Sequence, residues 1–295
     1  MRELDSSRPV WIDGERRDAS DATLPIDDPA LQSGLGLFET IATRGGAALD
    51  VAYHLERLAE GGQRLGAAAV DTSLMSTAIE EAAAVADEPA GWLKLIWSES
   101  GRWLLFGGAR DLAREGRPLR AKSLPWPHTA GGPLSGLKSL NYGAHELARR
   151  WAEAAGVDEA LWLDARGRFV EGSWSNLFVV RRGSLFTASL RDGVLPGVMR
   201  RRLLEQAKEW GLNVHLGAIR PKRIRYADEV FVTSSLAGIC PLVEIDGKAL
   251  RQSGGGLVRR FALKIGRLHR SVSDATFQTG HAGEIGGSNL DMEVE

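Results

Sequence analysis

The sequence has little cysteine and little lysine: Cys240 is its single cysteine, and only seven of its 37 basic residues are lysines. One cysteine excludes a disulfide framework within the chain and a cysteine cluster for zinc. The six histidines are scattered, and none of them pairs at a spacing typical of metal ligands. We therefore expect no metal centre, and each of the few lysines merits inspection.

Long apolar segments are also missing. No apolar run approaches the ~20 residues that a membrane-spanning helix requires. Residues 1–9 are charged and lack the apolar core of a signal peptide. These absences lead us to expect a cytoplasmic protein with no membrane partner.

The composition is otherwise that of an ordinary globular protein. Hydrophobic residues make up 43% and charged residues 25% of the 295 residues, a length that accommodates two medium-sized domains. The formal net charge of −1 lacks the basic excess of a general nucleic-acid binder. We expect a small-molecule ligand and no nucleic-acid partner.

Several common catalytic motifs are absent. The chain has no P-loop, and Gly34-Leu35-Gly36 lacks the third glycine of a dinucleotide-binding fingerprint. No Ser/His/Asp or Cys/His group can be assembled with a reason from the sequence. We therefore expect the catalytic residues to come from segments that are far apart in the sequence.

Residues 1–117 are predicted to form a small α+β domain. Asp13-Gly14, Arg44-Gly45-Gly46 and Glu99–Arg102 are turn signals between apolar runs, which indicates three hairpins. Apolar residues at helical spacing predict a helix over His54–Leu65, and an alanine-rich stretch predicts another over Thr72–Ala86.

The rest of the chain is predicted to contain a second, larger domain. Residues 118–133 are rich in proline and are expected to connect the two domains, and the larger domain covers residues 134–270. Residues 271–295 are rich in Gly, Ser, Asp and Glu and are expected to be a disordered tail. Within the larger domain, short strand signals alternate with three predicted helices, over Tyr142–Ala155, Pro196–Trp210 and Gly255–Leu268.

Five features of the sequence could carry chemistry. Lys138 has apolar neighbours, and a lysine in apolar surroundings has a depressed pKa and can act as a nucleophile or base. A helix that begins after Pro196 would offer free N–H groups to an anion. The others are an acidic turn, a helical arginine and two hydroxyls that follow a strand: Glu171, Arg57, Ser234 and Ser235. Taken singly, each also fits an ordinary surface lysine, turn or helix end.

The order of these features along the chain resembles that of the class IV aminotransferases, the fold-type IV enzymes of pyridoxal 5'-phosphate (PLP). The matching segments span about residues 30 to 250 and include Gly36–Thr40, His54–Leu58, Leu137–Asn141, Asp158–Leu161, Glu171–Phe178, Leu195–Arg200 and Ala227–Pro241. The resemblance implies a mixed α+β architecture of two domains. It also implies a homodimer, with the active site at the domain boundary.

The resemblance implies a role for each candidate residue. Lys138 matches the lysine that forms the Schiff base with PLP and carries the proton, and Glu171 matches the partner of the pyridine nitrogen. Leu195 matches the residue against the ring face. The cofactor phosphate would be held by Arg57, by the N–H groups of Val198 and Met199, and by Ser234 and Ser235.

The same resemblance leaves the reaction open between a lyase and an aminotransferase. Phe38-Glu39-Thr40 and Ser235–Pro241 resemble patterns of aminodeoxychorismate lyase, which releases 4-aminobenzoate and pyruvate. Asn141-Tyr142-Gly143 departs from that lyase, and Glu99 stands where many relatives carry a cation for a substrate carboxylate.

Four residues are therefore candidates for substrate contact: Phe38, Thr40, Arg102 and Tyr142, with Lys94 as a further cation. The lyase is the favoured interpretation. The alternatives are an amino-acid aminotransferase of the branched-chain or D-amino-acid type and a non-catalytic relative that acts as a binding protein.

Overall fold

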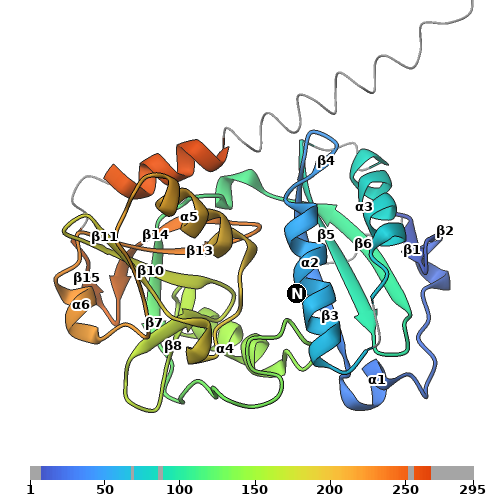
Figure 1. Cartoon of the computed structure of the whole chain (residues 1–295), viewed down its shortest axis with the longest axis horizontal. Coiled ribbons are helices and arrows are strands. Elements are labelled where there is room, and N and C mark those ends of the chain that lie inside the picture. Colours follow the sequence, from blue (N-terminus) through green and yellow to red (C-terminus); the bar gives the residue numbers. More distant parts are fainter. Residues whose placement is uncertain (1–7, 68–69, 86–88, 252–255, 267–295) are drawn as a thin grey trace, which may run out of the picture.

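A computed structural model describes residues 8–67, 70–85, 89–251 and 256–266 of the chain. Within them, two sheets lie side by side, one formed by each half of the sequence (Figure 1). The predicted tail at 271–295 and the ends of the last predicted helix lie outside the described residues. Residues 256–266 are helical, as that prediction requires.

The first half forms a six-stranded antiparallel sheet in the order β2-β1-β6-β5-β3-β4. The strands are β1 (Val10–Ile12), β2 (Glu15–Arg17), β3 (Gly36–Arg44), β4 (Ala47–Ala48), β5 (Ala90–Ser98) and β6 (Trp103–Ala109). Short α1 (Pro29–Ser33) precedes β3. The three predicted hairpins are confirmed, because each turn signal joins two antiparallel neighbours.

Helices α2 (Val51–Arg64) and α3 (Ser73–Val85) cover one face of this sheet (Figure 1). Their buried side chains pack with alternate residues of the strands, and this core includes Leu37, Ile41, Leu58, Ile79 and Leu95. The other face of β3 and β5 therefore presents Phe38, Thr40 and Lys94.

The second half forms a sheet of nine strands in the order β12-β11-β10-β13-β14-β7-β8-β9, with β15 beside β14. Strand β9 also pairs with β10, so six of the strands close into a ring. The strands are β7 (Leu119–Ser123), β8 (Glu159–Leu163), β9 (Phe169–Gly172), β10 (Asn176–Arg181), β11 (Ser184–Thr187), β12 (Val214–Leu216), β13 (Glu229–Ser234), β14 (Gly238–Ile245) and β15 (Lys248–Ala249).

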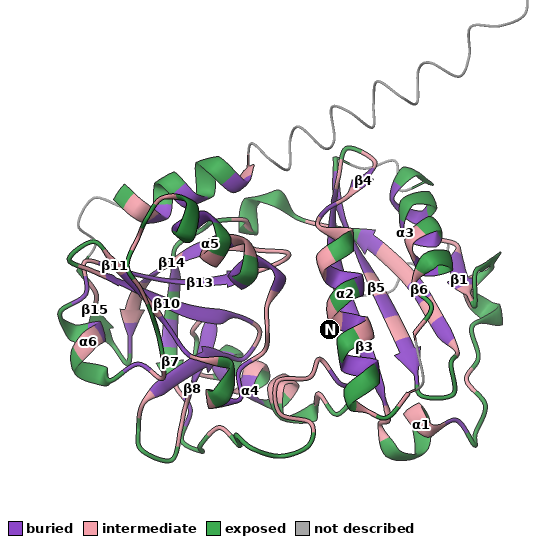
Figure 2. Ribbon diagram, viewed as in Figure 1, coloured by how far each residue is buried: buried purple, intermediate pink, exposed green. Residues whose placement is uncertain are grey.

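Buried residues follow the central strands β10 and β13 of this sheet (Figure 2). Helix α5 (Val198–Glu209) and the helical residues 256–266 pack on one side through a core that includes Met199, Leu203 and Phe261. Helix α4 (Gly143–Ala154) packs elsewhere on the sheet through Ala148 and Ala152, and α6 (Pro221–Arg225) lies beside β10.

The segment 118–133, expected only to connect domains, contributes strand β7 to the larger sheet. Leu119 and Ala121 are buried and alternate with exposed Arg120 and Lys122, which is the pattern of a half-buried strand. The surrounding prolines hid this pattern. Strand β12 and helix α6 were not predicted either, because both are too short to show a period.

No helix among the described residues is long and apolar enough to cross a membrane.

Candidate active site

The segment that carries Lys138 lies against strand β3 of the smaller sheet. Phe38 N donates to Lys138 O at 2.9 Å, and Leu140 N donates to Gly36 O at 3.0 Å. A side chain at Gly36 would overlap the carbonyl of Trp97, so the close approach of the strands requires glycine there. The backbone of β3 thus fixes Lys138 beside Phe38, at the boundary between the two sheets.

The Lys138 ammonium lies over aromatic rings. Its Nζ is 4.4 Å from the ring centroid of Phe38 and 5.3 Å from that of Tyr142. Burial, assisted by the positive charge of Arg57, lowers the pKa of Lys138 to about 8. Near neutral pH a useful fraction of this amine is therefore unprotonated and can act as a nucleophile or base.

Glu171, at the end of β9, is buried and held from several sides. Its Oε2 accepts from Asn176 Nδ2 at 3.2 Å and from the backbone N of Leu195 at 3.0 Å. Its Oε1 lies 3.5 Å from Nε2 of His128. Asn176 Nδ2 also donates to Leu195 O at 3.0 Å, which ties this carboxylate to the segment before α5.

A second carboxylate, Glu159, supports the loop between Glu171 and Asn176. It is fully buried and accepts from Ser173 N (2.9 Å), Ser173 Oγ (2.6 Å) and Ser175 Oγ (2.5 Å). Burial raises the pKa of Glu159 to about 7, although these hydrogen bonds oppose the shift. A Cβ on Gly172 would overlap Glu159 and Ser175, so the loop is packed tightly on this carboxylate.

Arg57 on α2 is paired with Glu39 on β3. Arg57 Nε donates to Glu39 Oε1 at 2.8 Å, and Arg57 Nη2 contacts Oε2 of the same carboxylate. Burial would raise the pKa of Glu39, but Arg57 and His54 outweigh it and lower the pKa to about 2. Arg57 Nη1 donates to Pro196 O at 3.1 Å, so the guanidinium lies at the approach to α5.

Helix α5 begins at Val198, with Gly197 as its N-cap. The N–H groups of Val198 and Met199 belong to the first turn, where no helical carbonyl is available to them. A Cβ on Gly197 would overlap Asn176 Oδ1, so glycine is needed where the helix start meets the loop of Glu171. This end of α5 has the donors and the dipole that favour an anion.

The turn after β13 contains the two predicted phosphate hydroxyls. Ser234 Oγ accepts from Ala237 N at 3.3 Å, and Ser235 Oγ lies 3.4 Å from His54 Nε2. The His54 Nδ1 is 2.6 Å from Glu39 Oε2, so Ser235 is linked through His54 to the carboxylate that holds Arg57.

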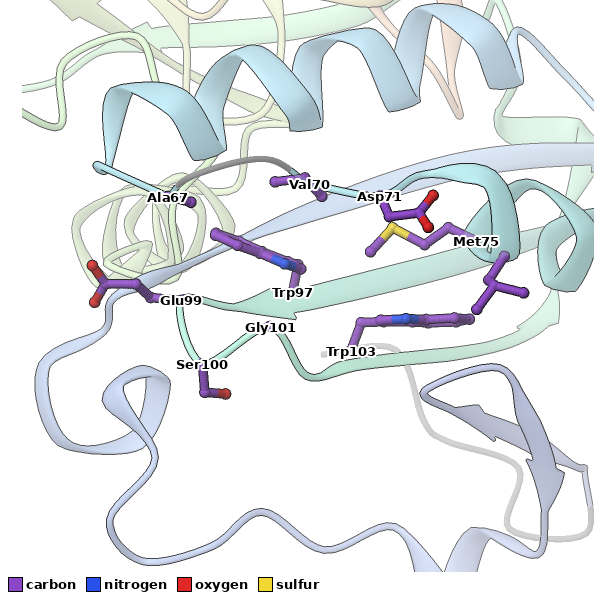
Figure 3. Close-up of a pocket in the computed structure, with 10 residues that line it drawn as sticks. Ala67, Val70, Asp71, Met75, Trp97, Glu99, Ser100, Gly101 and Trp103 are labelled. Carbon is purple, nitrogen blue, oxygen red and sulfur yellow. The ribbon is translucent and has the colours of Figure 1, made fainter.

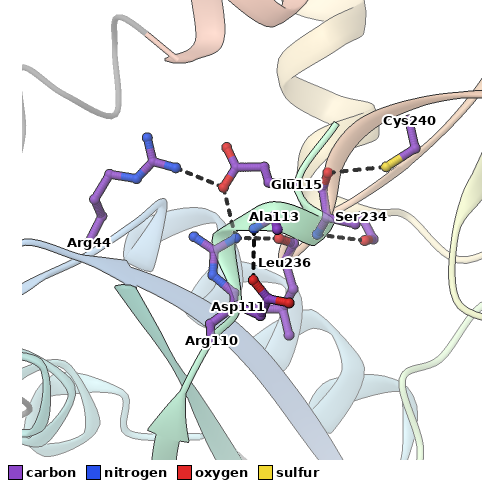
Figure 4. Close-up of polar contacts among 9 residues, drawn as sticks. Arg44, Arg110, Asp111, Ala113, Glu115, Ser234, Leu236 and Cys240 are labelled. Carbon is purple, nitrogen blue, oxygen red and sulfur yellow. Dashed lines mark hydrogen bonds and ion pairs between the residues drawn. The ribbon is translucent and has the colours of Figure 1, made fainter. Parts of the chain in front are cut away.

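The same turn is attached to the smaller sheet (Figure 4). Arg110 donates to Leu236 O and to Glu115 Oε2, and Arg44 donates to the same Glu115 oxygen at 2.7 Å. Both arginines belong to the first half of the chain, so these contacts hold the turn at the boundary between the sheets.

The candidate substrate residues divide into two groups. Phe38 and Tyr142 lie beside Lys138, and their rings pack edge-on with centroids 4.9 Å apart. Thr40 lies on the same face of β3 as Phe38. Arg102 instead pairs with Asp13, 3.4 Å away, on the hairpin of β1 and β2. Lys94, opposite Thr40 in register, lies 4.9 Å from the Phe38 ring.

Several residues of the site were not singled out from the sequence: Glu39, His54, His128, Glu159 and Asn176. Glu39, His54, Glu159 and Asn176 stood inside the matched segments, so their position was the available signal. His128 lies outside those segments and is placed beside β8 by the pairing of β7 with β8, which no local pattern reveals.

A separate cavity of about 330 Å³ lies on the helix-covered side of the smaller sheet (Figure 3). Trp97, Trp103 and Met75 line it, and Asp71 and Glu99 also border it. It shares no lining residue with the group around Lys138.

The group around Lys138 fits PLP. Arg57 and the first turn of α5 supply positive charge and N–H donors for a phosphate, and Glu171 supplies a carboxylate for a protonated ring nitrogen. Lys138 supplies an amine of lowered pKa. When bound, PLP provides an electron sink for the carbon that carries the substrate amino group.

Comparison with known proteins agrees with this fit. The amino-transferase class IV family matches residues 36–245. The chain is similar to the crystal structure of 4-amino-4-deoxychorismate lyase from Pseudomonas aeruginosa, with 32% identity, a TM-score of 0.76, and coverage of 87% of this chain and 97% of that one.

Two further relatives carry aminotransferase names. A hypothetical aminotransferase from Mycobacterium tuberculosis, solved with α-ketoglutarate and PMP, is 25% identical with a TM-score of 0.78, and the match covers 90% of this chain and 100% of that one. A branched-chain-amino-acid aminotransferase of P. aeruginosa is 27% identical, over 85% of this chain and 89% of the relative.

The fold and the site thus define an enzyme that uses PLP. The chain belongs to the amino-transferase class IV family and has its fold-type IV architecture. The predictions of family, fold, enzyme class and cofactor are confirmed. The family includes both lyases and aminotransferases among the relatives of this chain.

Proposed function

We propose that this enzyme is a lyase that converts 4-amino-4-deoxychorismate into 4-aminobenzoate and pyruvate. In this reaction a proton leaves the ring carbon that carries the amino group, and the bond from the ring to the enolpyruvyl oxygen breaks. The enolpyruvate takes up a proton to give pyruvate, and the remaining ring becomes aromatic. No keto-acid acceptor is consumed.

One observation carries this proposal. The two lyase-like patterns of the sequence, Phe38-Glu39-Thr40 and Ser235–Pro241, lie at the boundary where Lys138 stands. Phe38 contacts the ammonium of Lys138, and Ser235 is linked to Glu39 through His54. The 32% identity to the P. aeruginosa lyase supports the same reaction.

The chain's own residues would divide the work as follows. Lys138 would attach the cofactor and move the proton at the reacting carbon, while Glu171 would keep the ring nitrogen protonated. Arg57, Ser234, Ser235 and the first turn of α5 would hold the phosphate, with Leu195 against the ring. Phe38, Thr40 and Tyr142 would face the substrate.

The second candidate is an amino-acid aminotransferase. The aminotransferase is favoured by Tyr142, because the lyase often has arginine at this position. The Tyr142 ring packs on Phe38 beside Lys138. The branched-chain aminotransferases among the relatives point the same way. For either reaction, Arg102 supplies no cation beside Lys138, because it pairs with Asp13.

A pyruvate assay separates the two reactions. The PLP-loaded enzyme is mixed with 4-amino-4-deoxychorismate, and pyruvate is followed with lactate dehydrogenase and NADH in the absence of any keto acid. We expect pyruvate and 4-aminobenzoate in equal amounts, and no release by Lys138→Ala. Absence of pyruvate, together with conversion of the cofactor to its amine form by an amino acid, would establish the aminotransferase instead.

A further inference from the structure

His128 lies behind Glu171, in the segment between β7 and the Lys138 stretch. Its backbone N donates to Leu163 O at 2.7 Å, which fixes the residue beside β8. Its ring packs edge-on against Trp162, with centroids 5.7 Å apart. The side chain is 9% exposed, and Nε2 is 3.5 Å from Oε1 of Glu171, whose side chain is 5% exposed.

The two oxygens of Glu171 have different partners. Oε2 receives the hydrogen bonds of Asn176 and Leu195, whereas the recorded neighbour of Oε1 among the described residues is His128. His128 Nδ1 is buried and has no hydrogen-bond partner within the described part of the chain. A neutral imidazole with its proton on Nε2 would leave Nδ1 as an acceptor and would place a donor 3.5 Å from Oε1 of Glu171.

We propose that His128 is a positioning residue for Glu171, which orients Oε1 and stabilises its ionised form through Nε2–H. The inference rests on the proposed role of Glu171 toward the ring nitrogen of PLP. With two hydrogen bonds at Oε2 and a ring nitrogen beside Oε1, the carboxylate is kept in one orientation toward that nitrogen.

Other charged groups act on the same carboxylate. Lys138 and buried Arg200 are cations that interact electrostatically with Glu171. His145 on α4 also interacts with the charge of Glu171. His145 is directed elsewhere, however: its ring stacks on Tyr142 at 4.5 Å, and its Nδ1 contacts the carbonyl of Ser173 at 3.0 Å. The contribution of His128 must therefore be measured against these neighbours.

The first test needs no catalysis. NMR spectra of the histidine side chains in the full-length, cofactor-free protein would compare the wild type with Glu171→Gln. Replacing the carboxylate 3.5 Å from Nε2 should move the ring resonances of His128, while those of exposed His215, stacked on Phe186, should stay in place. An unchanged His128 in a folded Glu171→Gln protein would overturn the proposal.

The second test uses the PLP-loaded enzyme with two variants. His128→Gln keeps an N–H donor, and His128→Phe keeps only the ring shape. We expect the acidic limb of the kcat profile to move to higher pH in His128→Phe, with the visible absorption of the bound cofactor changing over the same range, and His128→Gln to restore most of both. Equal defects in both variants, without a shift in pH dependence, would reduce His128 to a packing residue.

The outcomes separate this inference from the proposed lyase reaction. Coupling between His128 and Glu171 in the cofactor-free protein, combined with no pyruvate release, would leave the positioning role intact and refute the lyase. Pyruvate release without coupling between His128 and Glu171 would support the lyase and refute the positioning role.

Discussion

At the scale of single residues, the site contains three buried carboxylates whose surroundings give them different properties. Glu39 faces a guanidinium and stays ionised to low pH, with a pKa of about 2. Glu159 faces only hydroxyl and N–H donors, and burial raises its pKa to about 7. Glu171 accepts neutral donors at Oε2 and faces an imidazole at Oε1. Partner chemistry, rather than residue type, therefore decides which carboxylate can carry a lasting charge.

Glu159 should make the stability of the protein depend on pH. Its pKa is raised from an ordinary 4.5 to about 7 on folding, so its contribution is fully present below pH 4.5 and is lost as pH rises through 7. Glu159→Gln imitates the protonated form and should remove this loss, which is on the order of 3 kcal/mol. Urea unfolding of the cofactor-free protein at pH 5 and pH 8 would measure it.

The control for this prediction is Glu153→Gln, because Glu153 is exposed on α4 and pairs with Arg149 on the same helix. That variant should follow the wild type at both pH values. If the wild type and Glu159→Gln lose equal stability between pH 5 and pH 8, the raised pKa is refuted.

Arg57 should be needed both for PLP retention and for the charge balance of Glu39. Arg57→Ala removes a residue proposed to hold the phosphate and leaves a buried carboxylate without this cation, which costs about 3 kcal/mol. The double variant Arg57→Ala/Glu39→Gln should recover much of that stability but not the cofactor. Dialysis followed by absorption spectroscopy would measure retention, and full retention in Arg57→Ala would show that Arg57 is not required for holding the phosphate.

At the scale of elements, helices α2 and α5 connect the two sheets through charged side chains. Arg202 on α5 donates to Asp50 through Nε at 2.7 Å, and Arg201 pairs with Glu56 at the same distance. Tyr53 on α2 donates to Glu205 at 2.8 Å and lies under both guanidinium groups. Because α2 carries Arg57 and α5 carries the N–H groups of its first turn, this contact sets the distance between the two groups that we propose to hold the phosphate.

Breaking the contact between α2 and α5 should therefore weaken PLP binding from a distance. Arg202→Ala leaves the 4% exposed Asp50 side chain without this cation, and we expect the dissociation constant of PLP to rise several-fold. Fluorescence titration of the cofactor-free protein would measure it. Arg191→Ala, on a turn outside this contact, is the matched control, and equal affinities in the two variants would contradict the coupling.

The sequence predicted those elements that are marked by a pattern within their own residues, such as a turn or the spacing of apolar side chains. The hairpins follow from glycine-containing turns, and α2 follows from the spacing of Leu55 and Leu58. Strand β7 was missed because both of its partners, β8 and β14, follow much later in the chain. Its pairing with them is parallel, so no tight turn marks it in the sequence. The site follows the same division. Lys138 and Glu171 were found through their segments, whereas the position of His128 depends on the parallel pairing of β7 with β8.

At the scale of the whole molecule, the site lies where two sheets of one chain meet (Figure 1). Lys138 hydrogen-bonds through its backbone to β3, Glu171 belongs to β9, and Arg57 reaches the start of α5 from α2. A change in the relative position of the sheets would separate the amine of Lys138 from the carboxylate of Glu171 and from the residues proposed to hold the phosphate. The contacts of Arg44 and Arg110 through Glu115 therefore matter to the site as well as to the fold.

The outer face of the smaller sheet gives the last prediction, which is that the enzyme is a homodimer. Helices α2 and α3 cover one face, but Ile96, Leu104 and Phe106 point to the other and remain partly exposed in the single chain. Apolar residues clustered on a sheet face are typical of a surface that a second copy buries.

We expect light scattering to give twice the mass of one chain. Leu104→Glu should shift the protein toward the monomer because it would bury a charge in the contact. Leu74→Glu, at an exposed position of α3, should leave the mass unchanged. A wild-type monomer at micromolar concentration would refute the dimer. A dimer that persists in Leu104→Glu would place the contact on another face of the chain.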